Sequence, residues 1–407
     1  MALLPIHSST ILICPLIILL ALNLPHIFYR NALTRWTTVF VVVLTSWVVL
    51  LSVRFENTAF SYLVGLFEAW IGIWALTFIV IHNPSQDFCR LIPVQKEVRD
   101  ATKGSTMCQE DGLMWQKFPP HISWERLAWT LDLFINLRGI GWSYRWGSYH
   151  VPIDIEGPPG GMHRERLPSR SDPPSLARLI IRFVGQVSWV MFCQVNIFPL
   201  LKAHLTEGGG SNAGFAVGLL AVTVSLITII ADIDLLNTTS TLLVTAFDTS
   251  RLLGLYAFPW AHPSPWGSLD AVTTKGILGF WGGFWHSYFS YGFKSVADWF
   301  TIGLGGGKIV SRISAMLVAF GLSGYMHFCA AFQLPGTSNP TYQFIFFVLQ
   351  AGGILIHLSL VALLPMGTGI TRQTFNISFC GFWLFCTRRF LFEDLIVAGF
   401  WEHGVAG

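Results

Sequence analysis

The chain is more apolar than a water-soluble protein. It has 407 residues, of which 53% are hydrophobic and 12% are charged, and its mean hydropathy is +0.56. Such a composition cannot provide a water-exposed surface, which excludes the soluble fold classes. The net charge of +3 is too small to indicate a nucleic-acid partner. We therefore expect an all-α integral membrane protein whose surroundings are the lipid bilayer.

Long apolar runs predict a polytopic bundle of about eight or nine transmembrane helices, because about 20 apolar residues are needed to cross a bilayer. The candidate runs are residues 10–29, 36–53, 60–81, 179–201, 213–230, 236–258, 309–334, 341–364 and 372–392. The run at 236–258 is rich in Asn, Thr and Ser, so it either faces a cavity or does not span. The aromatic stretch 280–293 is too short to span and predicts a re-entrant or interfacial helix.

A long polar segment divides the chain into three parts. Three expected spans lie in residues 1–81, the polar segment covers 82–178, and a membrane core with the remaining spans covers 179–407. The short loop between the first two spans carries Arg30 and Arg35, and parity places it on the same side as the long segment. We expect both to lie in the cytosol.

Three further patterns do not indicate a site. Most of the seven cysteines lie in apolar runs without paired spacing, so neither a disulfide framework nor a metal site is expected. His150 and Asp154 match the HxxxD pattern of soluble acyltransferases, but about 0.3 to 0.4 such matches arise by chance in a chain of this length. The glycine-rich stretch 303–308 lacks the GK[ST] ending of a phosphate-binding loop and indicates a flexible connection.

Histidines inside apolar runs indicate where chemistry takes place, because lipid penalises ionisable groups. His327 lies deep in AFGLSGYMHFCAAF, with Ser323 one turn earlier on the same helix face. A neutral imidazole in this setting can accept a proton from a hydroxyl group. The alternative is a histidine that only packs between helices and bonds to a carbonyl group.

His286 is the second candidate, in FWGGFWHSYFSYGFK. Two glycines lie one turn before it and Ser290 lies one turn after it, so a helix would place the imidazole beside a gap with a hydroxyl group. Trp281 and Trp285 are also one turn apart, and they either line a ligand pocket or anchor the segment at the membrane surface.

Three segments resemble the wax synthase-like branch of the membrane-bound O-acyltransferases, a branch common among fungal natural-product enzymes. NLRGIGWSYRW at 136–146, FWGGFWHSYF at 280–289 and SGYMH at 323–327 resemble the RGIGW, FWGRFWHQ and SGxxH elements of that branch. The order of these elements and the succession of spans agree from about Arg138 onward. The chain departs from the branch at two positions of the second element. Gly283 stands where the branch has Arg, and Ser287 stands where it has Gln.

The resemblance implies an acyl-CoA-dependent O-acyltransferase of secondary metabolism in the endoplasmic reticulum. His327 corresponds to the catalytic histidine and would act as general base on an acceptor hydroxyl. His286 corresponds to the second polar position of the active-site tunnel, and we expect it to stabilise the oxyanion. No cofactor is expected to remain bound. Acyl-CoA is the co-substrate, with acetyl-CoA expected, and a lipophilic terpenoid or polyketide alcohol is the expected acceptor.

Residues near the three elements complete the expected site. The basic residues Arg138, Arg145 and Lys294 are candidates for binding coenzyme A, although cations that anchor the chain at the membrane surface produce the same pattern. The expected substrate pocket is lined by Ser323, Trp281, Trp285, Ser290 and Asp248.

Two other functions remain open on the sequence. A membrane-embedded terpene or meroterpenoid cyclase on an acyltransferase-like scaffold would use the same histidines, or Asp248, to move protons in an apolar pocket. A lipid transporter or lipid-binding protein would line a path with the same polar residues. No inverted repeat of the transporter kind is visible in the sequence.

Overall fold

The computed structural model describes residues 8–93, 113–145, 175–207 and 214–401, with gaps at 248, 259–261, 263, 303–306, 335–337, 365–366 and 368. Within these residues the chain is predominantly helical, and its one sheet pairs β1 (Cys89–Pro93) with β2 (Leu113–Lys117) in antiparallel fashion. His150 and Asp154, most of 303–308 and Asp248 lie outside the described residues.

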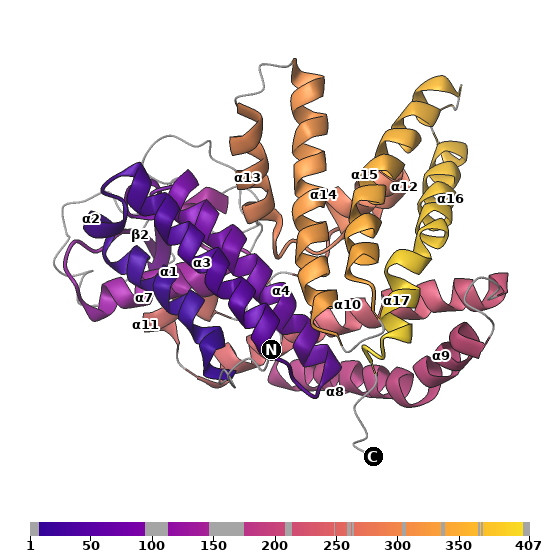
Figure 1. Ribbon diagram of the computed structural model, residues 1–407, viewed down its shortest axis with the longest axis horizontal. Helices are drawn as coiled ribbons and strands as arrows, with labels where there is room; N and C mark the ends of the chain where they lie inside the picture. Colours follow the sequence, from indigo (N-terminus) through magenta and orange to yellow (C-terminus); the bar gives the residue numbers. More distant parts are fainter. Residues whose placement is uncertain are drawn as a thin grey trace.

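The N-terminal helices gather on one side of the molecule (Figure 1). They are α1 (Ile13–Asn23), α2 (Pro25–Phe28), α3 (Ala32–Ser52), α4 (Thr58–Ala75), α5 (Pro84–Asp87) and α7 (Trp124–Ile135). A π-helical segment, η2 (Leu76–Ile81), extends α4, and short 3₁₀ turns occur at η1 (Ser8–Leu12) and η3 (Ser143–Arg145). A buried ion pair joins Arg90 of β1 to Asp132 of α7 at 3.0 Å and ties the sheet to the helices.

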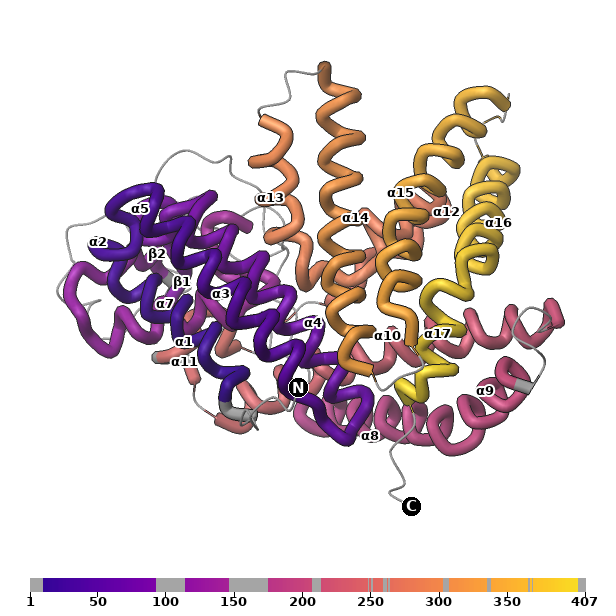
Figure 2. Tube along the Cα trace, viewed as in Figure 1, coloured from indigo at the N-terminus to yellow at the C-terminus, as the bar shows by residue number. Residues whose placement is uncertain are grey.

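The rest of the chain forms a second group, in which α14, α15 and α16 stand roughly upright over α8 and α10 (Figure 2). Its longer helices are α8 (Leu176–Phe192), α9 (Phe198–Glu207), α10 (Phe215–Ala246), α12 (Asp270–Gly279), α13 (Ser290–Ile302), α14 (Lys308–Phe332), α15 (Pro340–Leu363) and α16 (Ile370–Cys386). Its shorter elements are η4 (Cys193–Ile197), η7 (Phe280–Phe284), η8 (Arg388–Phe390) and α17 (Phe392–Val397). The short elements α11 (Ser250–Leu253) and η5 (Gly254–Ala257) instead pack against α7 and β1 of the first group (Figure 1).

Six helices of the described residues are long and apolar enough to cross a membrane. They are Ala32–Ser52, Thr58–Ile81, Leu176–Thr206, Phe215–Ala246, Lys308–Phe332 and Pro340–Leu363. The runs expected at 10–29 and 372–392 form the shorter helices α1 and α16. The helical membrane class is confirmed, whereas a total of eight or nine spans stays a prediction.

The runs at 213–230 and 236–258 were expected as separate helices, and this is wrong, since α10 passes through their junction without a break. The polar residues there do not end the helix because they bond to its own backbone. Thr238 Oγ1 donates to Asp234 O at 2.9 Å, and Thr241 Oγ1 donates to Asn237 O at 2.8 Å. Such bonds satisfy the hydroxyl groups inside an apolar helix.

The stretch 280–293 is not one helix. It begins as the π-helical turn η7, continues as a loop through Trp285, and ends in the first turn of α13. The loop is held to an upstream segment, because Gly267 N donates to Phe284 O at 2.9 Å and Ser287 N donates to Pro265 O at 3.2 Å. A re-entrant or interfacial position for this stretch stays a prediction.

Small residues allow α4 and α14 to approach closely. A Cβ atom added at Gly65 of α4 would lie 2.5 Å from Cys329 O and 2.6 Å from Ala330 Cα of α14. Helix pairs in membranes use glycine in this way to bring their backbones together. The contact sets the position of Tyr62, one turn before Gly65, relative to α14.

The substitution Gly65→Ala should destabilise the protein by about 1–3 kcal/mol, because the added methyl group meets backbone atoms that can yield only if the helices separate. Thermal unfolding in detergent measures the effect. Gly352→Ala on α15 is the matched control, since nothing lies within 4 Å of its added Cβ. Equal melting temperatures for the two variants would contradict the close contact.

Candidate functional site

His327 lies in the second half of α14, and one of its two ring nitrogens is hydrogen-bonded to the protein. Its Nδ1 is 2.6 Å from Tyr62 Oη of α4, and its ring stacks on Phe347 of α15 with the centroids 4.3 Å apart. Within the described residues its Nε2 has no hydrogen-bond partner, and the side chain is partly exposed. One nitrogen of the imidazole is therefore fixed by the protein while the other is available to a ligand.

The tyrosine next to His327 belongs to a longer chain of hydrogen bonds. Tyr62 Oη lies 2.7 Å from Gln343 Oε1, and Gln343 Nε2 donates to Asp394 Oδ2 at 2.9 Å. Asp394 also accepts from Ser338 Oγ at 2.7 Å and from Asn339 N at 3.0 Å. All of Tyr62, Gln343 and Asp394 are buried. The chain links α4, α14, α15 and α17.

Sequence reasoning missed Tyr62, Gln343 and Asp394. Tyr62 lies in an apolar run, where a tyrosine is an ordinary packing residue, and Asp394 lies in a short helix outside the candidate spans. Gln343 offered the one usable signal in the sequence, since an amide at the start of an apolar run needs a hydrogen-bond partner if it becomes buried, as it does in the structure. That signal indicates a hydrogen bond but not the residues that make it.

His286 lies in the loop after η7 and is surrounded by aromatic rings. The ring centroids of Trp266, Trp285, Tyr288 and Phe289 are all 5.5–5.9 Å from its own. Its Nδ1 is buried and has no hydrogen-bond partner within the described residues. Burial lowers the pKa of His286, and the positive charge of Arg138 lowers it further, to about 4. The imidazole is therefore neutral near pH 7.

The two histidines are connected through aromatic side chains. Trp285 contacts His286 and Trp281, with centroid distances of 5.5 and 5.4 Å. Trp281 in turn lies 5.9 Å from Phe347, the ring on which His327 stacks. The structure thus brings together four residues that the sequence assigned to one site, although far apart in the chain.

The RGIGW element is a tight loop that places Arg138. Asn136 closes the loop by accepting from Ile140 N at 2.9 Å and donating to Ile140 O at 2.8 Å. Gly139 and Gly141 have φ values of +65° and +76°, a backbone conformation that glycine adopts without strain. The glycines of the motif therefore form a tight turn, and this turn sets the position of Arg138.

Arg138 is buried and bonded to two other segments. Its guanidinium donates to Asn237 Oδ1 of α10 at 3.3 Å and to Ser264 O at 2.9 Å, and it lies 5.7 Å from the centre of the Tyr288 ring. This position lies beside the loop of His286. The structure thus places Arg138 of the RGIGW loop next to the segment that carries His286.

The other predicted residues lie at varied distances from the histidines. Two of these predicted residues contact each other, since Arg145 Nη1 donates to Ser290 Oγ at 3.1 Å. Ser290 is exposed at the start of α13. Lys294 is exposed one turn further along that helix. Ser323 is partly buried on α14, one turn before His327. Asp248 lies outside the described residues.

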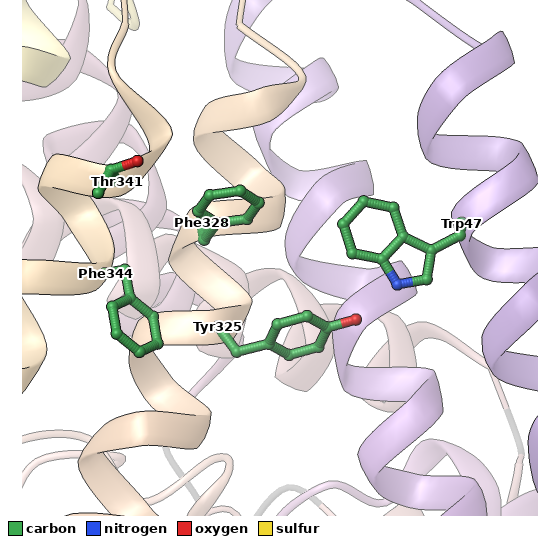
Figure 3. Close-up of a pocket in the computed structure, with 5 residues that line it drawn as sticks. All are labelled: Trp47, Tyr325, Phe328, Thr341 and Phe344. Atoms are coloured by element: carbon green, nitrogen blue, oxygen red, sulfur yellow. The ribbon is translucent and has the colours of Figure 1, made fainter.

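An apolar pocket of about 410 Å³ lies between α3, α14 and α15. Trp47, Tyr325, Phe328, Thr341 and Phe344 line it, and Figure 3 shows Trp47 across from the two aromatic side chains of α14. Tyr325 and Phe328 lie two residues before and one residue after His327, so they point to other sides of the helix. The pocket is therefore adjacent to the helix of His327 without containing its ring.

One stretch of the chain matches a known family. Residues 263–349 match the membrane bound O-acyl transferase family. The match supports a membrane acyltransferase. It includes His286 and His327 but not the RGIGW element, and the wax synthase-like branch stays a prediction. No curated protein and no solved structure matched the chain.

The lowered pKa of His286 predicts a loss of stability in acid. Its pKa is about 4 in the folded protein and about 6.5 in an unfolded chain, so the unfolded chain binds more protons between these values. The contribution of neutral His286 to the free energy of unfolding is fully present above about pH 6.5. It is lost as the pH falls toward 4, and the loss is at most about 3 kcal/mol.

Thermal unfolding in detergent between about pH 7 and pH 4.5 measures this effect. His286→Gln should flatten the dependence of the melting temperature on pH, because the amide does not titrate. His121→Gln, at an exposed position, should retain the wild-type slope. An unchanged slope in His286→Gln would show that His286 is not held neutral by its surroundings.

Proposed function

We propose that the protein is a membrane-embedded O-acyltransferase of the wax synthase-like branch. It transfers an acyl group from acyl-CoA to a hydroxyl group of a lipophilic terpenoid or polyketide in secondary metabolism. The acyl group is acetyl, and the donor is acetyl-CoA. It lies in the endoplasmic reticulum membrane with residues 82–178 in the cytosol. The observation that carries the proposal is that His327 and His286, inside the stretch that matches the acyltransferase family, lie at the two ends of one row of aromatic side chains.

His327 is the general base of the proposed reaction. Its open Nε2 accepts the proton of the acceptor hydroxyl as the oxygen attacks the thioester carbonyl. The C–O bond forms and the carbonyl electrons move to oxygen, which gives a tetrahedral oxyanion. When the carbonyl re-forms, the C–S bond breaks, and the coenzyme A thiolate takes the proton from His327. The histidine is thereby returned to its neutral state.

His286 is the proposed donor to the oxyanion. A neutral imidazole carries one N–H group, which is a hydrogen-bond donor of the kind that stabilises a tetrahedral intermediate. The aromatic rings around His286 exclude water on most sides, which strengthens an electrostatic interaction at this point. The proposal gives the two histidines different tasks, one as proton acceptor and one as hydrogen-bond donor.

We assign the binding of the phosphate groups of acyl-CoA to the two more exposed cations, Lys294 and Arg145. Lys294 is exposed, Arg145 is partly exposed, and both lie near the start of α13. Arg138 is buried and bonded to Asn237 and to the backbone, so we assign it to the shaping of the site and not to phosphate binding. The basic side chains suit the phosphate groups of coenzyme A.

Incubation of microsomes carrying the protein with labelled acetyl-CoA and a panel of lipophilic alcohols tests the proposal. Wild-type protein should transfer label to an alcohol, and His327→Gln should lower kcat by about 10²- to 10⁴-fold, because the general base is lost. His204→Gln, at an exposed position of α9, should retain activity.

Retention of most activity by His327→Gln would remove His327 from the reaction. A product with the same mass as its precursor, formed without label, would instead indicate a cyclase. Absence of any product across the panel, with folded protein in the membrane, would favour a transporter or lipid-binding protein.

A further inference from the structure

We infer that Asp394 sets the tautomer of His327 through a directed chain of hydrogen bonds, so that Nδ1 carries the proton and Nε2 is the basic nitrogen. Two intervening side chains, Gln343 and Tyr62, transmit the direction. The catalytic meaning of this inference rests on the proposed function, whereas the tautomer itself does not.

The direction of the chain begins at Asp394. Its Oδ1 faces Asn339 N, a backbone amide that can only donate, at 3.0 Å. Its Oδ2 faces Ser338 Oγ and Gln343 Nε2 at 2.7 and 2.9 Å. A carboxylate offers acceptors and no donor, and three donors converge on this one. The amide of Gln343 must therefore turn its NH₂ group toward Asp394 and its oxygen away.

The next two links follow from the number of protons available. The oxygen of Gln343 lies 2.7 Å from Tyr62 Oη and can only accept, so the single hydroxyl proton of Tyr62 is donated to it. Tyr62 Oη then has only lone pairs for His327 Nδ1, 2.6 Å away. His327 Nδ1 must be the donor. In a neutral imidazole the other nitrogen then has the free lone pair.

This tautomer is the one that general base catalysis requires. Nε2 is the nitrogen of His327 without a partner in the described residues, so it is the nitrogen left to accept from a bound hydroxyl group. The opposite tautomer would present an N–H group to the acceptor and could not take its proton. Asp394 touches no reacting atom in this scheme, so it is a positioning residue and not a catalytic one.

The substitution Asp394→Asn tests the inference because it preserves shape and changes one acceptor into a donor. The backbone N–H of Asn339 still demands an acceptor, which keeps the oxygen of the new amide toward it and turns the NH₂ group toward Gln343. Gln343 must then flip, and Tyr62 must donate to His327 Nδ1. The expected result is reversal of the tautomer, with the proton on Nε2.

Nitrogen-15 NMR of histidine-labelled protein in detergent reads the tautomer directly, since protonated and unprotonated ring nitrogens have well-separated shifts. The chain has 12 histidines, so the signals of His327 are assigned by their loss in His327→Gln. Wild-type protein should show Nδ1 protonated and Asp394→Asn should show Nε2 protonated. Asp298→Asn, at an exposed position of α13, should leave the signals unchanged.

The same variants are then assayed for acyl transfer. Asp394→Asn should lower kcat by about 10²- to 10⁴-fold, because the nitrogen that faces the acceptor no longer accepts a proton. KM for the donor should change little, since Asp394 contacts no substrate. Tyr62→Phe removes the acceptor of Nδ1–H, so it should abolish the preference for one tautomer and also lower kcat.

Protonated Nε2 in the wild-type spectrum would overturn the inference, and this measurement needs no variant to fold. An unchanged tautomer in folded Asp394→Asn would also overturn it. Reversal of the tautomer in that variant, in a protein that transfers no acyl group to any alcohol, would support the hydrogen-bond chain and reject the proposed function. The two ideas therefore fail on different observations.

Discussion

The hydroxyl group of one buried tyrosine connects the parts of this molecule on which the proposed chemistry depends. Tyr62 Oη lies between an amide oxygen and an imidazole nitrogen, and its single proton satisfies one of them while its lone pairs satisfy the other. A shift of α4 by even 1 Å would break one of these bonds. The close contact of Gly65 with the backbone of α14 is what holds the tyrosine in place.

The C-terminal segment holds the same arrangement from the other side. Thr58 Oγ1 at the start of α4 donates to Gly399 O at 2.9 Å, and the ring of Phe400 packs on Tyr62 with the centroids 4.9 Å apart. Trp401 stacks on Phe198 at 4.1 Å. Residues 391–401 thus bind α4 and α9 while Asp394 binds the start of α15. A short segment far from His327 in sequence fixes the helices around this residue.

The sequence was sufficient for the membrane class and for most helix positions, because each depends on local composition. It singled out both histidines from the cost of a polar group in lipid, and their roles stay a prediction. It was not sufficient for Tyr62, which is 265 residues away from His327, since their contact depends on how two helices pack. It also failed at α10 and at 280–293. In α10 polar side chains bond within the helix, and at 280–293 a loop is held by backbone bonds to 265–267.

The surroundings of the two histidines divide the proposed work between them. His327 becomes positively charged when it takes the proton of the acceptor, and a charged neighbour would oppose that step. Burial, and to a smaller extent Arg138, lower the pKa of His286, so a neutral His286 would add no positive charge near the proposed base. Under the proposed function, Arg138 would act through the pKa of His286 and not by contacting substrate. Two identical side chains receive different roles because one is oriented by a hydrogen-bond chain and the other is enclosed by aromatic rings beside a fixed cation.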